Sequence, residues 1–354
     1  MSPFVVSYKK YTLVFKKPAV TSREVLPTKT VFYLRLADRH QPERIGLGEC
    51  APWPGLSVDD RPDFETKLAE VCEALNAGQP PPEVDLADWP ALAFGLEMAW
   101  RDWQHGGNRQ LFENEFSRGQ QPIPIHGLIW MDSPAAMLQQ VHHKVSQGHR
   151  CIKLKVGALD FATESALLAD IRRYYPAAQI ELRLDANGAF GPDIAPERLA
   201  DLARFQIHSI EQPLKVGQWP ALAELCAHSP IKIALDEELI GVVTLARKRE
   251  LLETIKPHYL VLKPALLGGF AAAGEWLTLA QELGIGWWVN SALESNIGLN
   301  ALGQWTSSLK PTTVHGLGSG QLYSNNIPSP ITPGRGSLVY DPTLAWDVSD
   351  LVNR

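Results

Sequence analysis

The sequence predicts an α/β protein in which a (β/α)8-type barrel follows a smaller α+β capping domain. Two observations predict the barrel: from about residue 123 onward eight short apolar runs each end in a polar cluster, and amphipathic stretches separate most of them. Strands that alternate with helices are typical of right-handed βαβ units, and eight units in roughly 200 residues is the count of a barrel. An open, doubly wound sheet is the alternative. A third observation, a different pattern over the first 105 residues, predicts the separate domain.

The first domain is expected to combine an antiparallel sheet with helices. Apolar residues alternate at Phe32, Leu34 and Leu36, as in a strand with one buried face. The segments that predict strands are Phe4–Lys16, Thr30–Leu36 and Arg44–Glu49, and those that predict helices are Arg61–Ala77 and Trp89–Trp103. We therefore expect a capping domain over residues 1–105 and a linker over residues 106–122, where Gly, Gln and Asn are frequent.

The barrel is expected over residues 123–320. The runs that predict its strands are Ile123–Trp130, Cys151–Val156, Glu181–Ala186, His208–Pro213, Lys232–Glu237, Tyr259–Pro264, Gly286–Ser295 and Thr313–Gly318. Apolar residues at three-to-four spacing predict helices over Phe161–Tyr174, Pro196–Arg204, Trp219–His228, Leu245–Ile255 and Ala271–Leu283. We expect residues 321–354 to return to the capping domain, with the run Gly336–Tyr340 as a candidate strand of its sheet.

Composition excludes several classes of function. There are 33 Lys and Arg against 39 Asp and Glu, a net charge of −6, and no basic cluster, so we expect no nucleic-acid partner. No run of ~18 uncharged apolar residues spans a bilayer, and the amino terminus lacks the pattern of a secretory signal. The four cysteines have no CxxC spacing and are expected to be small buried side chains in a reducing cytoplasm. Oligomeric state stays open.

One charged residue recurs at the ends of consecutive predicted strands. Asp185, Glu211, Asp236 and Lys263 follow one another at separations of 26, 25 and 27 residues, one βα unit each. Catalytic groups of parallel barrels lie at the carboxyl ends of the strands, where the βα loops open. Adjacent strands are ~4.8 Å apart, so the three carboxylates can converge on one point. Any one of them alone is explained equally well as a helix cap or a surface ion pair, but three at one register favour a site.

Three carboxylates in a buried barrel mouth would repel one another and become protonated unless a cation neutralised them. All-oxygen ligands with room for water and substrate suit Mg²⁺ better than Zn²⁺. The sequence therefore predicts a site for Mg²⁺, or for another divalent cation such as Mn²⁺.

Lysines flank these acids. Lys153 and Lys155 are two residues apart on one predicted strand, so both point to the same face, and a second ammonium lowers the pKa of a lysine. Lys263, four strands further around the ring, would face Lys155 across the mouth. A KxK pair alone is more often the solvated edge of a strand. Beside a metal that chelates a carboxylate, however, opposed lysines predict removal of the α-proton of a small carboxylate substrate, because the cation stabilises the enediolate.

The chain also carries an ordered set of motifs. They are GECAPWPG in the first domain and IKLKVG, RLDANGAF, SIEQPL, ALDEEL, LVLKPALLGG and SALESNIG in the barrel. Each is weakly informative alone, but together they resemble the enolase superfamily in its muconate-lactonizing subgroup, and within it the o-succinylbenzoate synthase family. The resemblance covers nearly the whole chain. It implies dehydration of 2-succinyl-6-hydroxy-2,4-cyclohexadiene-1-carboxylate to 2-succinylbenzoate, in menaquinone or phylloquinone biosynthesis.

The resemblance implies a role for each charged residue at the strand ends. Lys155 would be the base, and Lys263 a cation near the enediolate. The ligands of Mg²⁺ would be Asp185, Glu211 and Asp236.

Further residues have less specific implied roles. Lys153 would position the substrate carboxylate or tune the base. Ser291 and Gly316 are the nearest matches to the family's site for the succinyl carboxylate. Asn187 and Arg183 share one face of the third predicted strand, which suits either support of the site and substrate or a hydrogen bond in the core.

Three other functions are weighed. An N-succinylamino-acid racemase or a dipeptide epimerase would use Lys155 and Lys263 on opposite faces of one carbon. Dipeptide epimerases typically carry Asp-x-Asp after the eighth strand, whereas Gly316–Gly320 contains no carboxylate. A non-catalytic scaffold barrel is the third alternative; it would be expected to have lost a ligand or a lysine, and none is missing.

Overall fold

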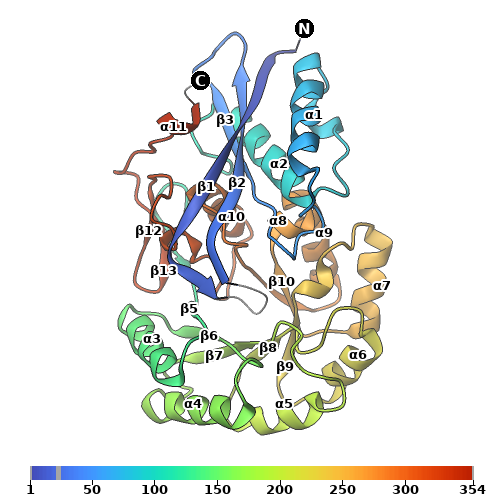
Figure 1. Ribbon diagram of the computed structural model, residues 1–354, viewed down its shortest axis with the longest axis vertical. Coiled ribbons are helices and arrows are strands. Elements are labelled where there is room, and N and C mark those ends of the chain that lie inside the picture. The colour runs from blue at the N-terminus through green and yellow to red at the C-terminus, as the bar shows by residue number, and fades with distance from the viewer. Residues whose placement is uncertain (1, 21–24, 353–354) are drawn as a thin grey trace.

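The computed structural model describes residues 2–20 and 25–352. An antiparallel sheet contains, in spatial order, β1 (Phe4–Val20), β2 (Val25–Asp38) and β3 (Ile45–Cys50). Helices α1 (Phe64–Ala77) and α2 (Pro90–Gln104) pack against it (Figure 1). The helix backbone lies directly on β3: a Cβ at Gly48 would lie 1.8 Å from the carbonyl oxygen of Gly95 on α2, so this position requires glycine.

The second part of the chain is a curled, seven-stranded parallel sheet in the order β11-β10-β9-β8-β7-β6-β5. Its strands are β5 (Gly127–Ile129), β6 (Cys151–Lys155), β7 (Glu181–Asp185), β8 (Ser209–Glu211), β9 (Lys232–Leu235), β10 (Tyr259–Leu262) and β11 (Gly286–Val289). The helices of this part are α3 (Pro134–Ser146), α4 (Phe161–Tyr174), α5 (Ala195–Ala203), α6 (Trp219–His228), α7 (Leu245–Ile255), α8 (Pro264–Leu267), α9 (Gly269–Glu282) and α10 (Asn296–Ser308). Helices α3 to α7 lie along the outer side of the curl (Figure 1).

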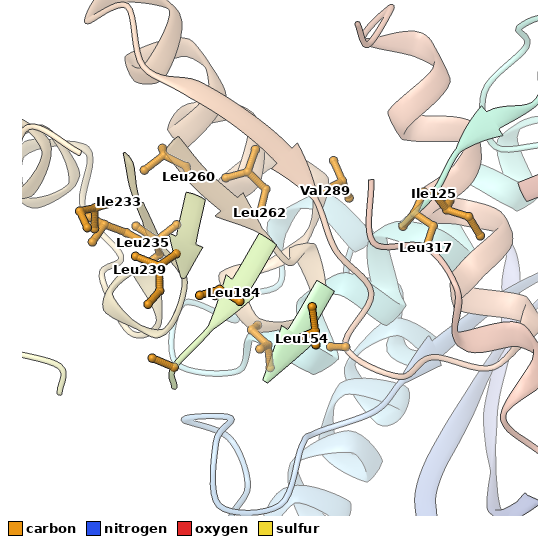
Figure 2. Close-up of a cluster of buried hydrophobic side chains, with 14 of the residues drawn as sticks. Ile125, Leu154, Leu184, Ile233, Leu235, Leu239, Leu260, Leu262, Val289 and Leu317 are labelled. Atoms are coloured by element: carbon orange, nitrogen blue, oxygen red, sulfur yellow. The ribbon is translucent and has the colours of Figure 1, made fainter. Parts of the chain in front are cut away.

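Alternation along each strand separates an outward apolar face from an inward face that carries polar and charged groups at the strand ends. The outward residues are buried with the helices and include Leu154, Leu184, Leu235, Leu262 and Val289 (Figure 2). The neighbouring inward positions carry the charged residues singled out in the sequence. The helices thus bury one face of the sheet and leave the other for chemistry.

The two edges of this sheet are connected by one extended segment. His315 donates its backbone N–H to the carbonyl of Pro124 at 3.0 Å, and Gly316 donates to the carbonyl of Val289 at 2.8 Å. The predicted eighth run therefore contacts both β11 and the chain before β5, although it forms isolated bridges rather than a regular strand.

The structure differs from two of the predicted strand assignments. The run Ile123–Trp130 is divided: β4 (Ile123–Pro124) leaves the parallel sheet and pairs with β13 (Ser337–Tyr340), which also pairs with β12 (Ile331–Pro333). The expectation that Gly336–Tyr340 joins the first sheet is therefore wrong.

Other parts of the carboxyl-terminal segment do contact the first sheet. Lys16 donates its backbone N–H to Leu322 at 2.8 Å, and Ser324 donates to Val14 at 2.9 Å. The last element is α11 (Ser349–Val352). Across the described part of the chain, we find no helix with the length and apolar character needed to cross a membrane.

Candidate active site

A cavity of about 1140 Å³ lies at the carboxyl ends of the parallel strands. Lys155 and Lys263 line it from the sheet, and Trp53, Leu56 and Phe15 line it from the first domain. The parallel sheet supplies the charged groups, and the capping loops cover them. The site is therefore shared between the two parts of the chain.

Ion pairs link the charged side chains that the sequence predicted. Lys153 donates to Asp185 at 3.0 Å and to Glu211. Lys155 lies 3.2 Å from the same Asp185 oxygen. The strand register places Lys155 beside Asp185, and Asp185 beside Glu211, so the cluster follows directly from the sheet.

Lys263 makes the corresponding pair on the same inward face, at the end of β10. Its Nζ lies 2.6 Å from Oδ2 of Asp236, and both side chains are largely buried. Burial would lower the pKa of Lys263, but the charges of Asp236 and Glu237 raise it overall. The ammonium group of Lys263 therefore stays protonated beside Asp236.

Burial and the alternation of lysines with carboxylates together determine the pKa values in the cluster. Burial would lower the pKa of Lys153, but Asp185, Glu211 and Asp236 outweigh burial and raise it. Burial would raise the pKa of Asp185, but Lys153, Lys155 and Lys263 lower it below its usual range. Burial raises the pKa of Glu211 to about 7, because its attraction to Lys153 only partly offsets burial and repulsion by the other acids.

The donor chemistry fits a divalent cation. Asp185, Glu211 and Asp236 offer only oxygen, and Oε1 of Glu211 is buried with no hydrogen-bond partner among the described residues. The predicted convergence is nevertheless incomplete. No three such side chains in the described ranges are gathered around one point, because ammonium groups lie between the carboxylates and neutralise them. A bound cation would take over that neutralising role.

Three of the four predicted supporting residues line the cavity: Asn187, Ser291 and Gly316. Asn187 accepts from Lys155 at 2.6 Å and donates to Glu237 at 2.8 Å, so it fixes the position of the lysine ammonium.

Arg183, Glu211 and Asp236 are not among the residues that line the cavity, and the contacts of Arg183 match the second of its two expected roles, a hydrogen bond in the core. Arg183 lies two residues before Asp185, deeper inside the curl, and is 1% exposed. Its guanidinium donates to Glu181 at 2.7 Å and to the carbonyl of Val314 at 3.0 Å, and lies 4.3 Å from the ring centre of Trp288. Arg183 thus stabilises the interior of the sheet.

Sequence reasoning missed two buried residues of the first domain that hold the loop after β11. Lys29 donates to the carbonyls of Ala292 and Leu293 at 2.6 and 3.1 Å. Leu293 has φ +59°, a strained conformation for a residue with a side chain, and the Lys29 bond holds its carbonyl. Lys29 lies between the polar residues Thr28 and Thr30, so the sequence gives no signal that it is buried.

Glu49 holds the same loop from β3. Its carboxylate accepts from the N–H and the hydroxyl of Ser295, at 2.9 and 2.6 Å, and from the N–H of Gly298 at 2.9 Å. Since Ser291 lies at the start of this loop, the first domain helps to position the wall of the cavity.

Comparison with known proteins agrees with this geometry. The family described as "Enolase C-terminal domain-like" matches residues 136–339, and "MenC, N-terminal domain" matches residues 6–103. The o-succinylbenzoate synthase of Desulfotalea psychrophila is 44% identical, over 96% of this chain and 99% of the relative. The chain belongs to the o-succinylbenzoate synthase family of the enolase superfamily.

Solved structures of the o-succinylbenzoate synthase family have the same fold. The crystal structure of MenC from Desulfotalea psychrophila superposes with a TM-score of 0.85 at 41% identity, covering 96% of this chain and 100% of that one. The o-succinylbenzoate synthase from Thermosynechococcus elongatus superposes with a TM-score of 0.71 at 28% identity, covering 88% and 92%, and is described as complexed with Mg in its active site. Relatives of this family thus indicate a divalent metal.

Proposed function

We propose that this chain carries out the Mg²⁺-dependent dehydration of 2-succinyl-6-hydroxy-2,4-cyclohexadiene-1-carboxylate to 2-succinylbenzoate, a step of menaquinone or phylloquinone biosynthesis. The observation that carries the proposal is the alternating cluster of lysines and carboxylates at the strand ends, in a chain of this family. A bound Mg²⁺ would neutralise the negative charge that develops on the substrate carboxylate, and its proposed ligands are Asp185, Glu211 and Asp236.

The lysines have separate proposed roles. Lys155 removes the α-proton of the substrate, and Asn187 orients its ammonium group. If proton and hydroxyl leave from the same face, Lys155 also returns the proton to the departing hydroxyl. Lys263 stays charged beside Asp236 and stabilises the enediolate, while Lys153 helps to hold the substrate carboxylate. Ser291 and Gly316 receive the succinyl carboxylate.

We also propose that the curled sheet is a (β/α)8-type barrel with residues 315–316 in the eighth strand. The hydrogen bonds from this segment to Pro124 and to Val289 support the assignment. The proposed division is a capping domain over 1–105, a linker over 106–122, the barrel over 123–320 and a returning segment over 321–354. The four free, buried cysteines support a cytoplasmic location.

The decisive experiment is incubation of the protein with Mg²⁺ and the cyclohexadiene substrate, with formation of the aromatic product followed by absorbance. N-succinylamino-acid racemisation is measured in parallel. The proposal requires dehydration well above background; racemisation with no dehydration would replace it by the racemase function.

The Lys263→Arg variant separates the two reactions further. A racemase must transfer protons on both faces of the carbon, and guanidinium cannot release its proton near neutral pH. We expect this variant to retain measurable dehydration and to lose any racemisation. Equal loss of both activities would mean that Lys263 transfers a proton in dehydration as well.

A further inference from the structure

One residue of the SIEQPL motif has no part in the proposed reaction. Gln212 follows Glu211, the last residue of β8, and its side chain is 1% exposed. Its backbone has φ +37°, a conformation that residues with a side chain rarely adopt. A buried polar residue held in this conformation beside a proposed metal ligand points to a specific task.

The backbone of Gln212 connects three neighbouring strand ends. Its N–H donates to the carbonyl of Ala234 on β9 at 2.9 Å, and its carbonyl accepts from the N–H of Gly188, in the loop after β7, at 2.7 Å. Gln212 itself begins the loop after β8. Each of these three strands ends in, or just before, one of the proposed ligands: Asp185, Glu211 and Asp236. Gln212 therefore lies where the three ligand-bearing strands meet.

The side chain of Gln212 holds the segment that follows β9. Its Oε1 accepts from the backbone N–H groups of Asp236 and Glu238, each at 3.2 Å. Its Nε2 donates to the carbonyl of Leu214 and to Oε2 of Glu238, each at 3.0 Å. These four bonds use both acceptor positions and both donor positions of the amide. The orientation of the amide is unique, because the reversed amide would place its NH₂ group against two N–H donors.

The segment that Gln212 holds carries two residues of the site. Asp236 pairs with Lys263 at 2.6 Å. Glu237 accepts from Asn187 at 2.8 Å, and Asn187 accepts from Lys155 at 2.6 Å. A displacement of this segment would therefore move a proposed metal ligand, and with it the contacts that orient the proposed base.

We infer that Gln212 is a positioning residue for the metal site, because it fixes the backbone of Asp236 relative to Glu211. The inference rests on the ligand set of the proposed function. Anionic ligands repel one another, so the backbone has to impose the short spacing that a shared cation requires. Residues that hold metal ligands in place typically contribute about 10–100-fold to metal affinity.

The test is a calorimetric titration of the metal-free protein with Mg²⁺, for the wild type and for Gln212→Met. Methionine has a similar length, but it offers the N–H groups of Asp236 and Glu238 no carbonyl acceptor. We expect Gln212→Met to weaken Mg²⁺ binding about tenfold or more. The melting temperature is measured in parallel, because the variant also leaves buried N–H groups unpaired.

The matched control is Trp219→Phe. The indole N–H of Trp219 donates to the other carboxylate oxygen of Glu238 at 2.7 Å, so this variant removes a bond of the same network without touching the backbone of Asp236. We expect it to lower the melting temperature and to leave the dissociation constant of Mg²⁺ near the wild-type value.

Each outcome supports or overturns the inference. Wild-type Mg²⁺ affinity in Gln212→Met would mean that Gln212 only stabilises the core, and equal weakening in Trp219→Phe would mean that any loss of this network has the same effect. If Gln212→Met does not fold, Gln212→Asn is the second variant. Asparagine tolerates positive φ, but its shorter side chain withdraws the oxygen from β9, so the same loss of affinity is expected and an unchanged affinity would overturn the inference.

Failure of the proposed function is distinct from failure of this inference. A wild type that binds Mg²⁺ and forms no 2-succinylbenzoate would refute the proposed reaction, whereas the Mg²⁺ affinities of the variants alone decide the role of Gln212. A wild type that binds no Mg²⁺ would overturn the ligand set and the role of Gln212 together.

Discussion

Asp236 forms a buried ion pair with Lys263, which lines the cavity, and this pairing is the basis of the first prediction. Asp236→Ala removes one proposed anionic ligand and leaves Lys263 without its partner. We expect loss of most Mg²⁺ affinity and nearly all activity, with a melting temperature within a few degrees of wild type, because strand-end groups at this face serve chemistry more than packing. Calorimetric Mg²⁺ titration and activity measure the two effects, with Asp170→Ala on the surface of α4 as control. Full wild-type activity in excess EDTA would refute the metal assignment.

Lys155 carries the second prediction. Lys155→Ala should abolish turnover while binding of 2-succinylbenzoate stays detectable, because the variant lacks a group needed chiefly in the transition state. Lys155→Arg should be almost as damaging, since guanidinium keeps its proton. Single-turnover rates and product binding are measured together. Near-normal kcat in either variant would exclude Lys155 as the base.

At the level of single residues, the charges that recur at one register were predictable from the sequence, and isolated buried polar residues such as Lys29 and Glu49 were not. The regular spacing is that of Asp185, Glu211, Asp236 and Lys263, which follow one another at 25 to 27 residues, so their common location follows from the fold. Asn290 lies inside the predicted run Gly286–Ser295 with no charge to mark it, although its side chain is buried and lines the cavity. Arg183 shares the face of the site, but its guanidinium bonds to Glu181 and to the carbonyl of Val314, and it does not line the cavity.

At the level of elements, amphipathic helices were predictable and uniformly buried or weakly patterned ones were not. The bounds predicted for α4, α6 and α7 agree with the structure. Helix α10 was missed because residues on all of its sides are buried, including the polar Asn300 and Gln304, so no apolar stripe exists. Helix α3 was missed because only Met137 and Val141 of its residues are buried.

The loop after β11 carries the third prediction. Glu49→Ala removes the acceptor of three hydrogen bonds from Ser295 and Gly298, and leaves these donors buried without partners. We expect a loss of about 3 kcal/mol or more in the free energy of unfolding. KM should rise more than kcat falls, because the loop carries Ser291. Urea denaturation and steady-state kinetics measure both.

The matched control for Glu49 is Glu65→Ala, which removes an exposed glutamate paired with Lys10 on the same domain. A surface change of this kind should alter stability by less than about 0.5 kcal/mol. Similar small effects of the two variants would mean that Glu49 does not anchor the loop.

For the whole molecule, the contact between the two parts of the chain predicts a pH dependence of stability. Burial raises the pKa of Glu294 from 4.5 to about 7, an effect that Lys29 opposes and Glu49 reinforces. Between these two values the folded chain keeps a proton that the unfolded chain has lost, so the free energy of unfolding falls as pH rises and then levels off above about pH 7. The full loss is on the order of 3 kcal/mol.

The variant Glu294→Gln checks this dependence. Its decline between pH 5 and 7 should be smaller than that of wild type, because Glu211, whose pKa is also raised to about 7, still contributes, and it should be more stable than wild type at pH 8, as measured by urea denaturation across this range. Glu224→Gln, 75% exposed on α6, should follow the wild-type curve. A Glu294→Gln curve parallel to the wild type would contradict the role of Glu294.

At the same scale, the sequence predicted the order of strands and helices but not the contacts between distant segments. The division of the run Ile123–Trp130 and the pairing of β4 with β13 depend on residues more than 200 positions away, and no local pattern records them. The contacts of Lys29 and Glu49 were not predictable either, because their partners also lie more than 200 positions away.

The contacts of Lys29 and Glu49 can form only late in translation. Lys29 and Glu49 emerge from the ribosome early, but their partners at residues 292 to 298 follow about 245 to 265 residues later. At 5–20 residues per second this delay is on the order of 10–50 s. Throughout that interval the nascent first sheet holds two ionisable side chains whose final surroundings do not yet exist. The substrate pocket is therefore among the last features that translation completes, and a chain arrested before residue 292 has the first domain without the wall it is built to hold.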